Sequence, residues 1–93
     1  MNNIIEKIKN NESTIVDVRS FQEYMGGHVA NSVNIPVNEV QYRLDEFREM
    51  KKPIILCCAS GARSGMATDI LKRNGIEDAY NGGSWLSVNS IAN

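Results

Sequence analysis

Aromatic side chains and excess positive charge are both scarce in this sequence. Phe, Trp and Tyr make up only 6% of the 93 residues, which is too few for a surface that stacks against single-stranded nucleic acid. Ten Lys and Arg residues against eleven Asp and Glu residues give a formal net charge of −1 at pH 7, whereas nucleic-acid-binding domains normally carry a basic excess. We therefore expect no nucleic-acid partner.

Long apolar runs and spaced cysteines are missing as well. No stretch approaches the ~20 apolar residues that a membrane helix needs, and the first residues lack the basic and apolar regions of a signal peptide. The two cysteines, Cys57 and Cys58, are adjacent. Neighbouring Cα atoms lie ~3.8 Å apart, which is below the usual ~4.4–6.8 Å range of disulfides. These absences predict a reduced, cytoplasmic protein with no disulfide staple and no membrane partner.

The remaining composition is that of an ordinary folded domain, with 42% hydrophobic and 23% charged residues. The length predicts a single domain over residues 1–93, with one modest core and room for one site. Short apolar runs alternate with segments of helical periodicity, which is typical of βαβ units. The predicted fold class is therefore α/β, with a central, mostly parallel sheet flanked by helices on both faces.

The predicted elements follow from local signals. Strands are expected at 14–18, 33–35, 53–57 and 79–80, and the third is central because it is the most continuously apolar. A capping box at Ser20–Glu23 predicts a helix that Gly26 and Gly27 stop. An opening helix is expected to end at Asn10 and Asn11, and another helix is expected over 64–74. The segment after Pro36 predicts one helix with Asn38 as N-cap and an apolar stripe of Val37, Val40, Leu44 and Phe47. A last helical turn is expected after a turn at Gly82–Gly83.

The segment from Cys58 to Ser64 links the most buried strand to the next helix. Ligands of open parallel sheets bind beyond the carboxyl ends of the strands. The small residues of this segment allow successive backbone N–H groups to surround one point, and the following helix directs its positive end there. A thiol in such a place ionises more readily than a free cysteine, and Arg63 adds a positive charge that suits an anionic substrate. The pattern predicts a nucleophilic thiolate, Cys58, in an anion-binding loop.

Cys57 is expected to play a different part from its neighbour. Successive side chains of a strand point to opposite faces, so Cys57 faces away from the predicted site. Buried cysteines often serve as small hydrophobic residues. We therefore interpret Cys57 as structural and Cys58 as reactive.

Several motifs occur in a fixed order along the chain: Ile15-Val16-Asp17-Val18-Arg19, Glu23-Tyr24, Gly27-His28-Val29, Asn34-Ile35-Pro36, Cys58-Ala59-Ser60-Gly61-Ala62-Arg63-Ser64, Gly75 and Tyr80-Asn81-Gly82-Gly83. Taken together in this order, they resemble rhodanese domains, and in particular the small single-domain thiosulfate sulfurtransferases. The resemblance extends from about Ile4 to Trp85.

The resemblance implies a sulfurtransferase that uses a persulfide on Cys58 and needs no metal or other cofactor. A small anionic sulfur donor such as thiosulfate would lie against the loop, and cyanide or a thiol would accept the sulfur. The implied substrate-binding residues are Ala59, Ser60, Gly61, Ala62, Arg63 and Ser64. A sulfur-relay protein is a further candidate partner.

Three other polar residues have more than one interpretation. Asp17 and Arg19 follow the first predicted strand on the same side as the loop, and the resemblance implies that they brace the site from behind. The alternative is an ordinary surface pair between Arg19 and Glu23. His28, the only histidine, is interpreted as an anchor of the core or of a loop, because no second histidine supports a metal site.

Three other functions remain as alternatives. A cysteine phosphatase or arsenate reductase normally has five residues between cysteine and arginine, whereas four separate Cys58 from Arg63. A protein-binding rhodanese module, non-catalytic or relaying persulfide, is the alternative from another class. A redox sensor in which Cys57 resolves an oxidised Cys58 ranks last, because disulfides between adjacent cysteines are strained.

Overall fold

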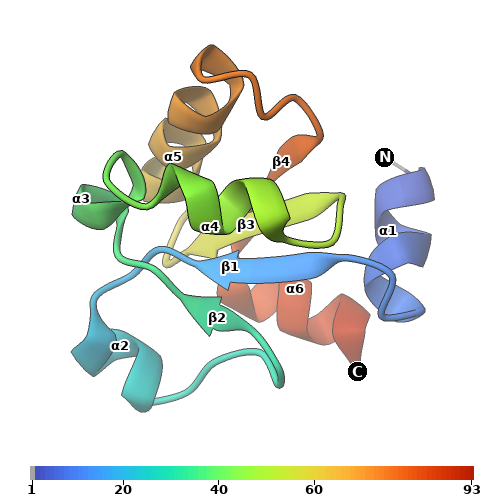
Figure 1. Cartoon of the computed structure of the whole chain (residues 1–93). Coiled ribbons are helices and arrows are strands. Elements are labelled where there is room, and N and C mark those ends of the chain that lie inside the picture. The colour runs from blue at the N-terminus through green and yellow to red at the C-terminus, as the bar shows by residue number, and fades with distance from the viewer. Residues whose placement is uncertain (1) are drawn as a thin grey trace.

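The computed structural model describes residues 2–93 and shows helices packed around one small sheet (Figure 1). The helices are α1 (Asn2–Lys9), α2 (Phe21–Met25), α3 (Val37–Val40), α4 (Leu44–Glu49), α5 (Ala62–Arg73) and α6 (Trp85–Ala92), and the strands are β1 (Thr14–Asp17), β2 (Val33–Asn34), β3 (Ile54–Cys58) and β4 (Ala79–Ser84). Within residues 2–93, no helix combines the length and the apolar character that crossing a membrane requires.

The sheet has the order β2-β1-β3-β4, and every pair of neighbouring strands is parallel. The chain leaves β1 toward one edge of the sheet and leaves β3 toward the other. The strand order therefore reverses between β1 and β3, where open parallel sheets form a crevice beyond the carboxyl ends of their strands. The predicted α/β class with a parallel sheet is confirmed.

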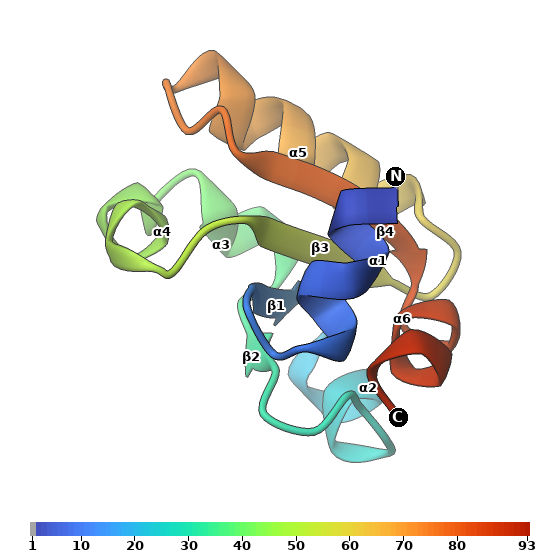
Figure 2. The ribbon, with the colours of Figure 1, turned by 90° about the vertical axis from the view of Figure 1, so that its right-hand side faces the viewer.

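Helices cover both faces of the sheet, as predicted (Figure 2). Side chains of β3 alternate between the two faces. Ile54, Leu56 and Cys58 pack in the cluster that α3, α4 and α5 cover, whereas Ile55 and Cys57 pack in the cluster that α1 and α6 cover. All five residues of β3 are buried, which confirms that this strand is central.

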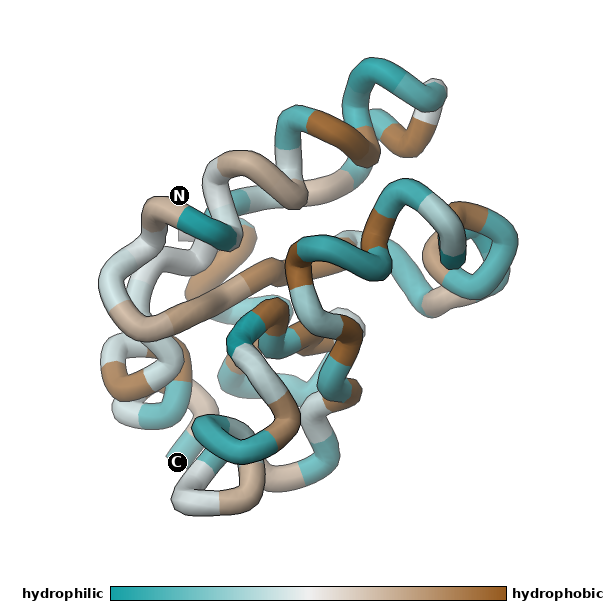
Figure 3. The backbone as a smooth tube through the Cα atoms, turned by 90° about the vertical axis from the view of Figure 1, so that its left-hand side faces the viewer, coloured by the Kyte–Doolittle hydropathy of each residue, from teal (hydrophilic) through white to brown (hydrophobic). Residues whose placement is uncertain are grey.

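The helices that pack on the core show one apolar side each. In Figure 3 their turns alternate between hydrophilic teal and hydrophobic brown, as expected for helices that cover a sheet with one side. In α5, the fully buried Ala67 and Leu71 form this side, and Ile70 is partly buried against the same cluster. One side of α5 therefore packs on the core.

The segment after Pro36 differs from the prediction of one helix capped by Asn38. Pro36 itself occupies the N-cap position of α3, and the helix is interrupted before α4 begins at Leu44. The predicted apolar stripe is nevertheless correct, since Val40 and Phe47 are buried and Val37 and Leu44 pack against the same cluster. A stripe on one side is compatible with one helix or with two short helices that face the same core.

Gly82 and Gly83 also differ from the prediction, because they lie within β4 and do not form a turn after it. The register between β3 and β4 shifts by one residue here, so that Leu56 pairs with Asn81 and Cys57 with Gly83. The β-bulge needs glycine because Gly83 has a φ of 85° and a Cβ on Gly82 would lie 2.9 Å from Ile55 and Val88. The bulge extends β4 to Ser84, and α6 follows as a helix of 8 residues, longer than the predicted turn.

Candidate active site

Cys58 is the last residue of β3, and Ala59, Ser60 and Gly61 connect it to the N-terminus of α5. The chain reverses at Gly61, the N-cap of α5, whose φ of 103° is in the region that favours glycine. The tight turn therefore depends on glycine and brings the start of α5 over the Cys58 sulfur.

Hydrogen-bond donors converge on the sulfur of Cys58. The backbone N–H of Gly61 lies 3.0 Å from Sγ and that of Ser64 lies 3.4 Å from it. The Ser64 hydroxyl is also 3.4 Å from Sγ. Burial alone would raise the pKa of Cys58, but hydrogen bonds from the Ser64 hydroxyl and from the N–H groups of Ser64, Gly61 and Ser60 together lower it to about 7. The site favours a thiolate near neutral pH.

Cys57 lies on the other face of the sheet and has the opposite electrostatic environment. Burial raises the pKa of the Cys57 thiol to about 12, and the negative charge of Asp17 contributes in the same direction. The different faces and opposite pKa shifts agree with the interpretation of Cys57 as a buried structural residue.

The loop that follows Cys58 is shorter in the structure than the sequence predicted. Helix α5 begins at Ala62, not at Ser64, so Ala62, Arg63 and Ser64 form its first turn. Local signals placed the helix start too late because Gly61, the N-cap, has no side chain to mark it. The donors to the sulfur therefore come from the N-cap and the first turn of a helix, where backbone N–H groups are free to bind outside the helix.

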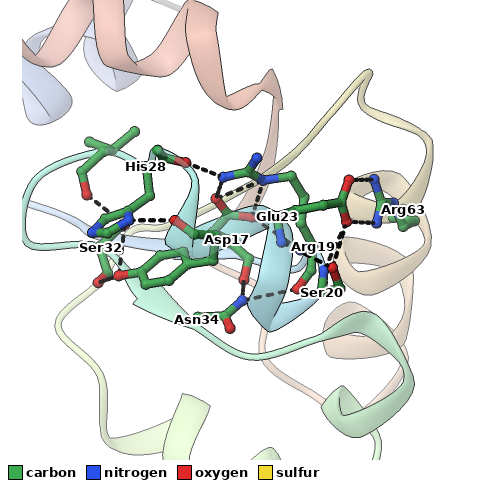
Figure 4. Close-up of polar contacts among 11 residues, drawn as sticks. Asp17, Arg19, Ser20, Glu23, His28, Ser32, Asn34 and Arg63 are labelled. Atoms are coloured by element: carbon green, nitrogen blue, oxygen red, sulfur yellow. Dashed lines mark hydrogen bonds and ion pairs between the residues drawn. The ribbon is translucent and has the colours of Figure 1, made fainter.

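Arg63 is ion-paired with Glu23 of α2 (Figure 4). Its Nη1 lies 2.7 Å from Oε1 and its Nη2 lies 3.1 Å from Oε2 of the carboxylate. The hydrogen bonds from Arg63, and next the backbone N–H of Ser20, lower the pKa of Glu23 to about 2. The Arg63 guanidinium, which the sequence predicted to bind an anionic substrate, is thus held by the carboxylate of Glu23 at the exposed edge of the site, which is called its rim below.

Asp17 and Arg19 form a buried pair at the end of β1 (Figure 4). The carboxylate raises the pKa of Arg19, and Arg19 also donates to the carbonyl of Gly27 at 2.7 Å. Its guanidinium lies over the Trp85 ring, 4.8 Å from the centroid. The alternative of a surface pair between Arg19 and Glu23 is therefore wrong: Glu23 pairs with Arg63, and Arg19 links β1 to α6.

Asn81 belongs to the site although sequence reasoning gave it no role. It follows Tyr80 in β4, the neighbour of β3 in the sheet. The Ser64 hydroxyl donates to its Oδ1 at 2.7 Å, and its Nδ2 donates to the carbonyl of Gly61 at 3.1 Å. The signal that could have found it is a polar side chain near the carboxyl end of a strand beside the central one.

His28 anchors a loop, as one of the two predicted interpretations held. It stacks on Tyr24 with ring centroids 3.7 Å apart, and its Nδ1 lies 2.7 Å from the Tyr24 carbonyl oxygen. In the part of the chain that the structure describes, no three His, Cys, Asp or Glu side chains are grouped to hold a metal ion.

A hollow of about 350 Å³ lies beside Arg63. Its apolar wall includes Val18, Phe21 and Val37, and its polar wall includes Ser20 and Arg63. The Phe21 side chain is 58% exposed. The hollow is open to solvent and has room for a small organic molecule next to the rim of the site.

Comparison with known proteins identifies the family. The sequence pattern of the rhodanese-like domain matches residues 2–85. The chain is 37% identical over 70 residues to the uncharacterized protein YqhL of Bacillus subtilis, covering 75% of this chain and 55% of that protein. It is 38% identical over 77 residues to the putative sulfur carrier protein YrkF of the same organism, covering 82% of this chain and 41% of that protein. The chain thus spans about half the length of these relatives or less.

A third relative and two solved structures extend the comparison. A putative mitochondrial thiosulfate sulfurtransferase of Schizosaccharomyces pombe is 32% identical over 98 residues, with 90% of this chain and 69% of that protein covered. The human single-domain sulfurtransferase TSTD1 shares the fold with a TM-score of 0.76 at 21% identity, covering 94% of this chain and 89% of that one. A rhodanese with anions from E. coli has a TM-score of 0.74 at 30% identity, covering 81% and 89%.

Proposed function

Because the chain belongs to the rhodanese-like sulfurtransferase family, we propose that it transfers sulfane sulfur through a persulfide on Cys58. The observation that carries this proposal is the set of N–H donors around the Cys58 sulfur, which lowers the pKa of its thiol to about 7. A thiolate is the nucleophilic form of cysteine, and the lowered pKa increases the share of Cys58 that is a thiolate at neutral pH.

The proposed first step uses thiosulfate as the donor. The Cys58 thiolate attacks the outer sulfur, a new S–S bond forms, and the S–S bond of thiosulfate breaks as sulfite leaves with its electron pair. The product on the protein is a persulfide with a negative terminal sulfur. The N–H groups of Gly61 and Ser64 and the positive end of α5 stabilise charge at this place.

The proposed second step returns the enzyme to its starting form. Cyanide or the thiolate of an acceptor attacks the terminal sulfur and leaves as thiocyanate or as a new persulfide, while Cys58 regains its thiolate. Arg63 would contribute positive charge toward an anionic donor, in competition with the carboxylate of Glu23.

A sulfur-relay role is a second candidate, favoured by the similarity to a putative sulfur carrier protein. In this role a protein persulfide would replace thiosulfate as the donor, and the chemistry at Cys58 would be the same. The two candidates differ only in the group that delivers the sulfur. Comparing thiosulfate with a small organic persulfide as donor therefore separates them.

A steady-state assay of thiocyanate formation tests the proposal. We expect Cys58→Ser to abolish activity with thiosulfate and cyanide, because serine is not a nucleophile of comparable strength at neutral pH. The matched control is Cys57→Ser, which makes the same atomic change on the other face of the sheet and should largely keep activity. Equal loss in both folded variants would contradict the assignment of Cys58.

A further inference from the structure

The orientation of the Asn81 side chain is fixed by the backbone around it. The N–H of Gly83, which can only donate, lies 3.0 Å from Oδ1, and the carbonyl of Gly61, which can only accept, lies 3.1 Å from Nδ2. These two contacts identify the oxygen end and the nitrogen end of the carboxamide. Asn81 therefore presents its oxygen to the Ser64 hydroxyl, 2.7 Å away.

The Ser64 hydroxyl has one hydrogen and two neighbours that could take it. Its oxygen lies 2.7 Å from Oδ1 of Asn81 and 3.4 Å from Sγ of Cys58. Since the carboxamide oxygen carries no hydrogen, Ser64 must be the donor in the shorter contact. The contact between Ser64 and Cys58 then requires the thiol S–H as donor. A thiolate has no hydrogen, so it keeps this contact only if the hydroxyl turns away from Asn81.

We propose that Asn81 is a positioning residue that holds the Ser64 hydroxyl toward itself and thereby favours the thiol form of Cys58 at rest. The proposal rests on the proposed function, in which Cys58 is the nucleophile. When Cys58 ionises, its proton passes to solvent and the Ser64 O–H turns to the sulfur. The Asn81 oxygen then keeps the N–H of Gly83 as its donor. Asn81 and the thiolate thus compete for one hydrogen.

The charged groups around the loop form ion pairs, so they do not take over the effect of the competition between Asn81 and the Cys58 thiolate. Arg63 of α5 is paired with Glu23 of α2, and Arg19 is paired with Asp17 at the end of β1. Cys57 stays neutral because burial raises its pKa to about 12. Each ion pair has no net charge, so the hydrogen bonds at the sulfur are the contribution to the Cys58 pKa that Asn81 can change.

The test is the pH dependence of Cys58 alkylation by iodoacetamide in the full chain, located by peptide mass spectrometry. Four proteins form a double-mutant cycle: the native chain, Asn81→Ala, Ser64→Ala and the double variant. We expect Asn81→Ala to move the midpoint about one pH unit lower, because the hydroxyl becomes free to donate to the thiolate. Ser64→Ala should raise the midpoint in both backgrounds, and by about one pH unit more in the Asn81→Ala background than in the native chain.

Two further variants make the outcome specific to the hydroxyl. Asn81→Asp keeps an acceptor for Ser64 and should raise the midpoint, and part of that rise should disappear in the Ser64→Ala background. Asn74→Ala is the matched control, because Asn74 also holds a backbone carbonyl of α5, at its other end, and should leave the midpoint unchanged. Far-UV circular dichroism checks that each variant is folded.

Additive effects in the cycle would overturn the proposal, because they would mean that Asn81 acts on the loop and not through Ser64. A higher midpoint in Asn81→Ala would also overturn it. Alkylation needs no sulfur donor or acceptor, so the result stands apart from the test of sulfur transfer. A chain that shows the expected cycle but forms no thiocyanate would contradict the proposed function alone.

Discussion

The buried pair of Asp17 and Arg19 gives a prediction whose magnitude follows from the structure. Asp17 is 0% exposed and Arg19 is 5% exposed. One carboxylate oxygen accepts from the backbone N–H of Arg19 at 3.0 Å, and the other accepts from Nη2 at 2.7 Å. The substitution Asp17→Asn removes the negative charge and leaves the guanidinium buried without a counter-charge.

Breaking a buried ion pair by changing one partner typically costs about 3–5 kcal/mol. A chain of 93 residues, at roughly 0.05–0.15 kcal/mol per residue, has a free energy of unfolding of about 5–14 kcal/mol. Asp17→Asn should therefore remove a large share of the stability. The loss should appear in urea unfolding as a lower midpoint with an unchanged slope.

The matched control is Asp45→Asn, which removes the same charge from a surface pair with Arg48. The side chain of Asp45 is 96% exposed, and such pairs contribute about 0–1 kcal/mol. A second comparison adds Arg19→Leu to Asp17→Asn, and the double variant should lose less than the sum of the two single losses. If Asp17→Asn cost no more than Asp45→Asn, the reasoning about the buried pair would be refuted.

Three other predictions concern the site. In the native chain, the rate of Cys58 alkylation should rise with a midpoint near pH 7, and a midpoint at the ordinary cysteine value of ~8.5 would contradict the donor arrangement. Glu23→Gln keeps a capping-box residue but removes the charge that holds Arg63, so the KM for thiosulfate should fall several-fold with little change in kcat. The control is Glu46→Gln, which removes the charge of a carboxylate that pairs with Arg43, and it should change neither KM nor kcat. Because the pKa of Cys58 is lowered on folding, it should contribute about 2 kcal/mol of stability above pH ~8.5. That contribution should be lost as the pH falls through 7, and urea unfolding should show no such loss in Cys58→Ser.

Features set by neighbours in the sequence could be predicted, and the capping box shows why. Ser20 and Glu23 are three residues apart, and the structure contains both reciprocal hydrogen bonds of the box. The alternation of Cys57 and Cys58 between two faces was equally predictable, because a strand imposes it over adjacent residues. In each case one element contains the whole interaction.

Features that join distant segments could not be predicted in the same way. Glu23 and Arg63 are 40 residues apart, and Ser64 and Asn81 are 17 apart. Each contact depends on how two elements pack, which local patterns do not determine. The late start assigned to α5 has a different, local cause, because its N-cap, Gly61, has no side chain to mark the beginning of the helix.

The most direct test of sulfur transfer through Cys58 is the intact mass of the reduced protein after thiosulfate, followed by cyanide. Sulfur transfer through Cys58 predicts a gain of one sulfur atom (~32 Da) that maps to Cys58 and is lost as thiocyanate appears. The Cys58→Ser variant should gain nothing. A folded, reduced chain that forms no adduct with thiosulfate, or an adduct that persists in Cys58→Ser, would contradict the account.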